Sequence, residues 1–284
     1  MKDIFFVYNP RSGSAYQLTA LKRACSTAGV PVKEFIPIAN DMAKKLRRPI
    51  SEGATIAVLG GDGTMNTLAN LLVNTKAVMA PLMGGTFNHF TKDLGVPQRL
   101  DEALAKLSAA KIQKIDTVSV NGVYFVNNSM LGLYPQSLQI RSTLQKRYGK
   151  WPAAVVAVVR TIVKFHTYYI SIDGKDYRTP YVFIGNNHFG LERLGLPGRK
   201  KFDGAEMSVY VAHARSRWSI MKLTFMAAIG KLKEAGEFDI LAVDQEFTVQ
   251  TKRKKMRVSH DGELSHMRTP LVYKLHPKSL QILC

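Results

Sequence analysis

Strands and helices are predicted to alternate along the first 116 residues, and this alternation constrains the fold more than any other feature of the sequence. Short β-branched and apolar runs, each expected to be a strand, lie at 4–8, 32–37, 54–59 and 77–82. Stretches with helical character lie at 15–28, 41–48, 64–73 and 100–110. The run at 54–59 is typical of a central parallel strand, because it is largely apolar on both faces. Such alternation predicts a parallel sheet with helices on both faces.

The pattern changes after Asp116, where predicted strands outnumber helices. These strands lie at 118–130, 168–173, 181–186, 207–211, 246–251, 256–260, 269–275 and 280–283. Asp173-Gly174 is a dipeptide typical of a hairpin turn. Two helical stretches, 138–165 and 218–234, interrupt this half. We therefore expect an α/β domain at 1–116 and a β-rich, mostly antiparallel domain at 117–284.

The charge of the chain is strongly positive. Forty Lys and Arg residues against 21 Asp and Glu residues give a net charge of +19. Such a surface attracts phosphates, whether they belong to a nucleotide, a nucleic acid or an anionic membrane. The most apolar stretch, 151–165, contains Arg160 and Lys164 and falls short of the roughly 20 residues that span a bilayer. The N-terminal run is too short for a signal peptide, so we expect a cytoplasmic protein.

Three glycine-rich loops follow predicted strands of the first half. They are Asn-Pro-Arg-Ser-Gly-Ser at 9–14, Gly-Gly-Asp-Gly-Thr at 60–64 and Gly-Gly-Thr-Phe-Asn at 84–88. Ligands of open parallel sheets collect at the carboxyl ends of strands, and glycines let main-chain N–H groups approach phosphate oxygens. Asp62, which lies between glycines, is suited to act through a divalent cation. Any one loop alone is also consistent with a simple turn or helix cap.

Further motifs follow in the second half, and the complete set runs through nearly the whole chain. The set comprises Asn9-Pro10-x-Ser12-Gly13, Gly60-Gly61-Asp62-Gly63-Thr64 with Asn66, Gly85-Thr86-x-Asn88, Asp116, Phe125-x-Asn127, Gly132, Asn186-Asn187, Gly190, Asp203-Gly204 and Asp261-Gly262-Glu263. In this order, the set resembles the diacylglycerol kinase catalytic-domain family, in particular the soluble bacterial lipid kinases that are related to sphingosine and ceramide kinases.

The resemblance implies an enzyme that works between two domains. A Rossmann-like α/β domain would bind ATP and Mg²⁺, a β-rich, sandwich-like domain would bind the lipid acceptor, and the active site would lie in the cleft between them. The acceptor would be a hydroxyl of a diacylglycerol-, glycerolipid- or sphingoid-like molecule. By position in the motifs, the nucleotide would contact Asn9, Ser12, Gly61, Asp62, Gly63, Thr64, Thr86 and Asn88.

Three acidic motifs carry the catalytic and metal roles that the resemblance implies. Asp261 and Glu263 match the Asp-Gly-Glu of the family, in which the aspartate is taken as the general base. Asp62 would act through magnesium, and Asp203 matches a position linked to a structural metal in some members. From the residues alone, both Asp261-Gly262 and Asp203-Gly204 are also typical of turns.

Two positions depart from the family pattern. His89 stands where an aspartate of the magnesium network is usual, and Thr67 stands where glutamate is common. Neutral imidazole is a poor ligand for magnesium, which prefers oxygen. We expect weaker metal binding, or coordination shifted to Asp62, phosphate oxygens and water. A kinase with altered metal geometry is the favoured interpretation, and a non-catalytic nucleotide- or lipid-binding protein is the alternative.

The lipid side of the prediction depends on two basic or amphipathic segments. The helical stretch from Trp218 places apolar residues on one face, which suits either a membrane surface or the core of the domain. Residues 252–257 are basic enough to attract anionic headgroups, although a solvated edge strand explains them as well. We expect peripheral association with the inner face of the membrane, and a homodimer is possible.

Two other functions compete with this one. NAD kinase also uses a Gly-Gly-Asp-Gly-Thr loop, but the Asn9-Pro10 opening and the Gly85-Thr86-x-Asn88 loop favour a lipid kinase. A nucleic-acid binder is not expected, because the sequence lacks a helix-turn-helix, zinc-ligand spacing or an aromatic RNA-binding motif.

Overall fold

The chain forms two compact units, Met1–Thr117 with His276–Cys284 and Val118–Leu275. The structure is a computed structural model, which describes residues 3–10, 16–86, 88–132, 167–188, 201–213 and 238–284, and the single positions 135, 156, 216, 218, 219, 222 and 226. No helix among the described residues is both long enough and apolar enough to span a membrane.

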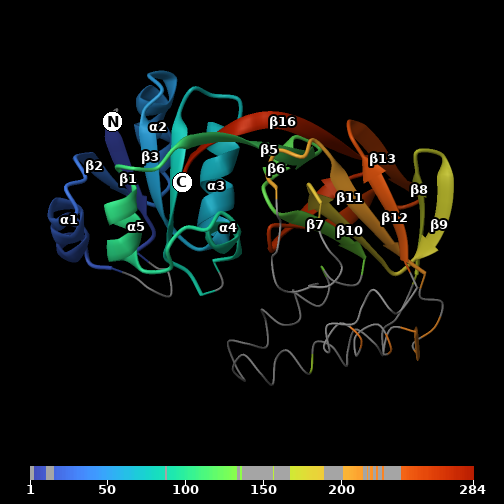
Figure 1. Cartoon of the computed structure of the whole chain (residues 1–284). Coiled ribbons are helices and arrows are strands. Elements are labelled where there is room, and N and C mark those ends of the chain that lie inside the picture. Colours follow the sequence, from blue (N-terminus) through green and yellow to red (C-terminus); the bar gives the residue numbers. More distant parts are fainter. Residues whose placement is uncertain are drawn as a thin grey trace. The chain divides into compact units, whose positions relative to one another are not determined.

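Unit 1 is built on a parallel sheet (Figure 1). Its strands are β1 (Ile4–Tyr8), β2 (Val32–Pro37), β3 (Thr55–Gly60) and β4 (Val78–Met83), in the spatial order β2-β1-β3-β4. Every residue of β3 is buried, which explains why every residue of this strand after Thr55 is apolar. All three pairings are parallel, as the sequence predicted.

The helices cover the sheet from both faces, because successive residues of a strand point to opposite sides. They are α1 (Leu18–Thr27), α2 (Met42–Ser51), α3 (Asp62–Leu72), α4 (His89–Asp93) and α5 (Leu100–Lys106). Ile4 and Phe6 of β1 share one core cluster with Leu21 of α1 and Leu104 of α5. Helix α3 lies against β3 and β4. The predicted covered parallel sheet is thus confirmed.

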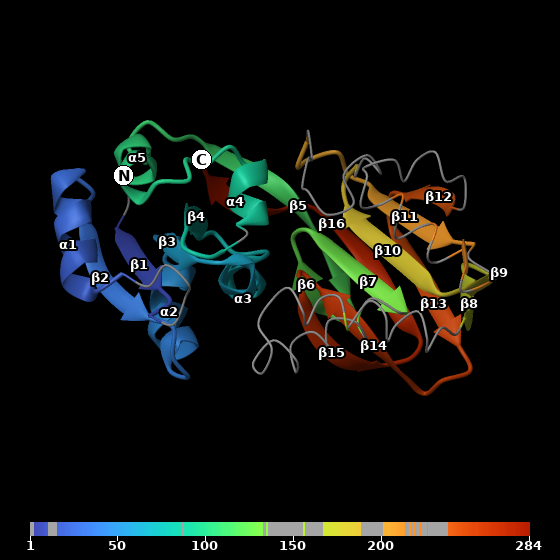
Figure 2. The same cartoon turned by 90° about the horizontal axis from the view of Figure 1, so that it is seen from below.

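Unit 2 contains two layers of antiparallel strands with a core between them (Figure 2). One sheet has the order β12-β11-β10-β7-β14-β15, and the other contains β13, β8 and β9. Side chains of both sheets meet in one cluster, in which the Tyr273 and Phe247 rings stack at 5.0 Å. The strands are β5 (Ile112–Val120), β6 (Val123–Phe125), β7 (Asn128–Gly132), β8 (Tyr168–Ile172), β9 (Lys175–Thr179), β10 (Tyr181–Asn186), β11 (Met207–Ala212), β12 (Phe238–Val243), β13 (Glu246–Thr251), β14 (Lys255–His260), β15 (Glu263–Arg268) and β16 (Leu271–Leu283).

Strand β16 takes part in the sheets of both units. Its first half pairs antiparallel with β13, and its last residues pair parallel with β4. The sequence analysis predicted two separate strands here, at 269–275 and 280–283, and Pro277 lies in the gap between them. It also grouped 276–284 with the β-rich part, whereas these residues belong to unit 1. Leu280 and Ile282 are fully buried and anchor this segment.

Other predicted elements of the second half differ in detail. The strand predicted at 118–130 is broken by a turn at Asn121-Gly122, where both residues have positive φ. The hairpin turn at Asp173-Gly174 is confirmed, and it joins β8 to β9. Strands β9, β12 and β15 were not predicted. The helices predicted at 138–165 and 218–234 lie outside the described residues, apart from a few single positions.

Candidate active site

The first glycine-rich loop is hydrogen-bonded to the second at the carboxyl edge of the unit 1 sheet. The main-chain N–H of Asn9, which directly follows β1, donates to the carbonyl oxygen of Leu59 at 3.2 Å. The Asn9 side-chain amide donates to Thr64 Oγ1 at 3.4 Å. Thr64 is buried in the first turn of α3, so Asn9 ties the exit of β1 to the start of this helix.

The second and third loops pack main chain against main chain. The N–H of Gly84 donates to the carbonyl oxygen of Gly60 at 3.0 Å. A Cβ atom on Gly85 would lie only 2.4 Å from the Gly61 Cα, and one on Gly84 would lie 2.8 Å from the Gly60 nitrogen. Real Cβ atoms almost never come so close to the main chain of a neighbour. None of these four glycines has a positive φ, so close packing of the two loops, rather than turn geometry, requires glycine here.

Asp62 links the second loop to the third. It is the first residue of α3, and its Oδ1 accepts a hydrogen bond from the main-chain N–H of Phe90 at 3.0 Å. The N-terminus of α3 lacks a side-chain cap among the described residues, and Gly61, Asp62 and Gly63 are only partly buried. This end of the helix therefore presents main-chain N–H groups and the positive end of the helix dipole to an incoming anion.

Asn88 shapes the third loop from within. It is 5 % exposed and has a left-handed backbone, with φ of 53°. Its Oδ1 accepts from the Gly85 N–H at 2.8 Å, and its Nδ2 donates to the Gly85 carbonyl at 2.9 Å. Thr86 is exposed within the loop that Asn88 closes. Both hydrogen bonds of Asn88 fix the loop, so this side chain holds the main chain in place.

The three loops thus converge, and most of the predicted nucleotide residues lie at one edge of the sheet. Ser12 lies outside the described residues. His89 is the first residue of α4, and Thr67 donates its hydroxyl to the Gly63 carbonyl at 2.9 Å. The predicted effect of His89 and Thr67 on magnesium stays a prediction.

Asp261 in unit 2 is held by the main chain of a neighbouring segment. It begins the turn between β14 and β15, where Asp261 and Gly262 have φ of 46° and 84°. Its carboxylate is buried, and Oδ1 accepts from the N–H groups of Asn127 at 2.8 Å and Asn128 at 3.0 Å. Oδ2 accepts from the Val126 N–H at 2.8 Å. Asp261-Gly262 does form a turn, as the residues alone indicated. The Asp261 side chain in addition accepts hydrogen bonds from the Val126–Asn128 segment.

The Val126–Asn128 segment is also fixed from its other side. The side-chain amide of Asn186 on β10 donates to the Val126 carbonyl at 3.0 Å, and the Asn186 N–H donates to the Asn127 carbonyl at 3.0 Å. The main-chain N–H of Asp261 donates back to the Asn128 carbonyl at 2.9 Å. Three N–H donors stabilise the ionised form of the Asp261 carboxylate and hold it in one orientation.

The residues beside Asp261 have contrasting environments. His260 is buried, and burial lowers its pKa below the ordinary value, so its ring is neutral at neutral pH. Its Nε2 lies 2.8 Å from Ser265 Oγ. Glu263 is exposed as a residue, yet neighbouring atoms partly desolvate its carboxylate and raise its pKa. His260 therefore adds no positive charge near Asp261 at neutral pH.

Asp203 is exposed on the segment that precedes β11. Within the described parts of the chain, no three side chains of His, Cys, Asp or Glu cluster in a way that could hold a metal ion. The metal role of Asp203 therefore stays a prediction. The loop residues belong to unit 1, whereas Asp261 and Glu263 belong to unit 2, and their meeting in a cleft also stays a prediction.

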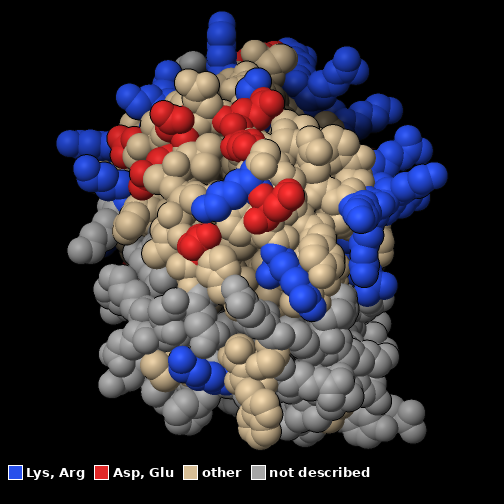
Figure 3. Space-filling model, turned by 90° about the vertical axis from the view of Figure 1, so that its right-hand side faces the viewer, with Lys and Arg blue, Asp and Glu red and all other residues tan. Residues whose placement is uncertain are grey.

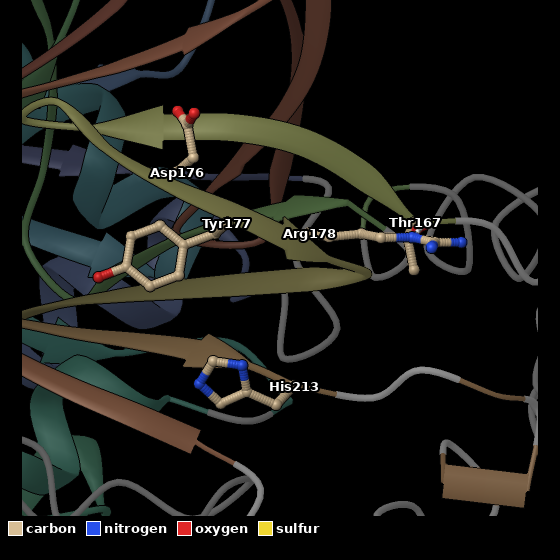
Figure 4. A pocket seen from close by; sticks show the side chains of 5 residues that line it. All are labelled: Thr167, Asp176, Tyr177, Arg178 and His213. Atoms are coloured by element: carbon tan, nitrogen blue, oxygen red, sulfur yellow. Dashed lines mark hydrogen bonds between the residues drawn. The ribbon is translucent and has the colours of Figure 1, made fainter.

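Two cavities lie away from the predicted residues. One of about 410 Å³ in unit 2 is lined by residues of β9 and by His213, which follows β11 (Figure 4). The other, of about 760 Å³, lies in unit 1 along α1 and α5. Neither cavity is lined by a residue predicted to bind nucleotide or to act in catalysis.

Comparison with known proteins shows what the loop-bearing part of the chain is similar to. Residues 3–120 match the family model described as "Diacylglycerol kinase catalytic domain". A "Putative lipid kinase" of Staphylococcus aureus (strain MSSA476) is 27 % identical over 288 residues, which cover 97 % of this chain and 92 % of that protein. A "Putative lipid kinase" of Staphylococcus haemolyticus (strain JCSC1435) is 28 % identical over 242 residues, which cover 80 % and 75 %. The resemblance inferred from the motifs is thus confirmed.

Solved structures share the fold of this chain. A crystal structure titled as a putative diacylglycerol kinase from Bacillus anthracis str. Sterne matches 99 % of this chain and 95 % of its own, with a TM-score of 0.78 and 22 % identity. A second structure, titled as a diacylglycerol kinase from the same organism, matches with a TM-score of 0.75 and 21 % identity. The fold class, a parallel α/β sheet followed by antiparallel β layers, is confirmed.

The sequence analysis missed the main-chain donors around Asp261. It noted Phe125-x-Asn127 and Asn186 only as family marks and gave them no role. Main-chain N–H groups have no side-chain signature, so the only available signal was the recurrence of the paired asparagines, at 127–128 and at 186–187.

Proposed function

We propose that the protein is a lipid kinase that transfers the γ-phosphoryl group of MgATP to a hydroxyl of a diacylglycerol-, glycerolipid- or sphingoid-like acceptor. The observation that carries this proposal is the main-chain packing of the second and third loops, which brings three strand ends and the start of α3 together. A site made of glycine main chain beside a helix N-terminus suits phosphate.

The loops of unit 1 would bind the nucleotide. Main-chain N–H groups at Gly61, Gly63 and Thr64 would contact the phosphates, and the positive end of α3 would favour their charge. The Asp62 carboxylate, held by the Phe90 N–H, offers the oxygen ligand that Mg²⁺ prefers. When bound, the ion neutralises charge on the phosphates. Asn9 and Asn88 would act by holding the loops in place rather than by recognising the nucleotide.

Asp261 would orient the acceptor hydroxyl and take its proton. Phosphoryl transfer is mostly a matter of positioning, and its transition state is loose, so a strongly basic group is not required. A carboxylate that is ionised and held by three N–H groups suits this task, because it cannot rotate away from the alcohol. Glu263, two residues further on, would be the second carboxylate of the site.

The working location follows from the proposed acceptor. A lipid hydroxyl is presented at a bilayer surface, so the protein would associate peripherally with the cytoplasmic face of an anionic membrane. The net charge of +19 supports this association.

Product identification tests the proposal. The protein is incubated with MgATP and a total lipid extract, and phosphorylated products are identified by mass spectrometry. An Asp62→Asn variant serves as the control for contaminating kinases. A new phospholipid that depends on Asp62 supports the proposal. Phosphorylation of NAD in a parallel reaction, or ATP binding without transfer to any lipid in magnesium or manganese, would refute it.

A further inference from the structure

The β14–β15 hairpin has one apolar and one basic face. Met256, Val258 and Met267 are buried, whereas most of the residues that alternate with them are exposed; Ser259, at the end of the hairpin near the turn, is buried. The exposed residues on this face of the two strands are Lys255, Arg257, Leu264, His266 and Arg268. Because neighbouring side chains of a strand point to opposite faces, all five lie on the outer side of the hairpin.

The register of the hairpin places positive charges directly opposite each other. Lys255 pairs with Arg268, and Arg257 pairs with His266. Like charges in a cross-strand pair destabilise a sheet, and opposite charges would stabilise it. In the second pair, Arg257 Nε donates to His266 Nε2 at 3.1 Å, so this ring nitrogen acts as an acceptor. Among the described residues, no such side-chain hydrogen bond joins Lys255 to Arg268, so the repulsion in this pair is not offset in that way.

The turn between β13 and β14 extends this charge. Lys252, Arg253 and Lys254 are all exposed. The Arg253 guanidinium lies over the Tyr168 ring at 4.8 Å, and its carbonyl oxygen accepts a hydrogen bond from the Thr269 hydroxyl. Arg253 is thereby held in place. None of the ion pairs among the described residues involves these three residues or Lys255, Arg257 and Arg268.

Protection of a sheet edge accounts for only part of this arrangement. Charged residues on an edge strand discourage aggregation, and β15 is an edge strand. Strand β14 pairs with β7 only from Val258 to His260, so Lys255 and Arg257 also lie at a margin of the sheet. Edge protection does not, however, require like charges directly opposite each other across the hairpin. Figure 3 shows a group of Lys and Arg side chains along the right-hand margin of the viewed face, while other Lys and Arg side chains lie at its left and top and beside the Asp and Glu side chains near its middle.

We propose that this basic face, made of Lys252, Arg253, Lys254, Lys255, Arg257 and Arg268, binds the surface of an anionic lipid bilayer. Anionic headgroups would relieve the repulsion that the cross-strand pairing creates. Leu264, which is 38 % exposed on the same side, adds an apolar group that a bilayer interface accepts. The choice of a membrane over other polyanions rests on the proposed function, because a lipid kinase must meet its acceptor at a bilayer.

Vesicle binding tests the proposal without ATP or turnover, so the result is independent of whether the lipid kinase proposal holds. Sedimentation with phosphatidylcholine vesicles, with and without phosphatidylglycerol, gives the partition coefficient of the full chain. Removing one basic residue from such a surface weakens binding roughly fivefold, so the Lys255→Gln/Arg268→Gln variant should bind the anionic vesicles about 25-fold more weakly. The matched control is Lys44→Gln/Arg47→Gln, which removes the same charge from exposed positions of α2. It should stay within about twofold of the wild type.

A second readout separates a binding role from a structural one. Removing the like-charge pair should leave the midpoint of urea unfolding unchanged or raise it, and Lys255→Glu should raise it further by pairing with Arg268. The proposal is overturned if both double variants lose vesicle binding equally, since net charge alone would then decide. It is also overturned if the wild type does not bind the anionic vesicles, or if the Gln variant keeps its affinity for them but loses affinity for RNA.

Discussion

Replacing Asp261 by asparagine should destabilise the β-rich unit, because the carboxylate accepts three main-chain hydrogen bonds. The Asn Oδ1 can still accept from Asn127 and Asn128, but the Nδ2 group then faces the Val126 N–H, and two donors oppose each other. A buried donor without an acceptor costs about 1–3 kcal/mol, and each bond that changes from charged to neutral loses about 1 kcal/mol. The expected loss in the free energy of unfolding is therefore about 3–5 kcal/mol.

Urea unfolding followed by far-ultraviolet circular dichroism measures this loss. Glu263→Gln is the matched control, since it removes the same charge two residues away from an exposed position, and it should change the free energy of unfolding by less than about 0.5 kcal/mol. If Asp261→Asn unfolds at the same urea concentration as the wild type, the carboxylate does not hold the Val126–Asn128 segment. The result also bears on kinetics, because lost transfer in this variant would reflect lost positioning as well as a lost base.

Three further predictions concern the charge and protonation of the site. Asp62→Asn should lower transfer at least about 100-fold, because the carboxylate proposed to hold Mg²⁺ beside the phosphates is lost. The Asn Oδ1 can still accept from the Phe90 N–H, so the unfolding midpoint should change little, and transfer rates and unfolding midpoints measured together check both parts. His89→Asp should shift the magnesium dependence of transfer to lower concentrations, and an unchanged metal titration would show that this position is irrelevant. The pKa of His260 is lowered by burial, so the folded state binds a proton less readily than the unfolded state. Stability should therefore be complete above the ordinary pKa of 6.5 and should fall as pH drops below it, and His260→Asn should remove that slope in urea titrations at several pH values.

The periodicity of the sequence predicted the parallel half of the fold well. Strand β3 is buried on both faces, and such a strand leaves an unbroken apolar run that can be read directly. Strand β15 was missed because four of its six residues are exposed and only Met267 is buried, so its pattern was that of a loop. The continuity of β16 was missed because Pro277 argues against a strand, whereas the structure places it where the strand passes from one unit to the other.

The parts of the candidate site that depend on particular side chains or on glycines could be predicted from the sequence. The loops at 60–64 and 84–88 were found because they are rich in glycine and follow predicted strands of a parallel sheet, where ligands collect. The support of Asp261 was not predictable, because it comes from N–H groups of a segment more than 130 residues away in sequence. Only the fold brings that segment to the β14–β15 turn.

The affinity of the Gly85→Ala variant for MgATP is the most direct test of the central claim, which is that loops packed main chain to main chain form the nucleotide site. A methyl group here would lie 2.4 Å from the Gly61 Cα, so the second and third loops must move apart. Isothermal titration calorimetry should show a loss of affinity of at least about tenfold, equivalent to about 1.4 kcal/mol, with the circular dichroism spectrum of the fold retained. A variant that binds MgATP as tightly as the wild type would contradict the account.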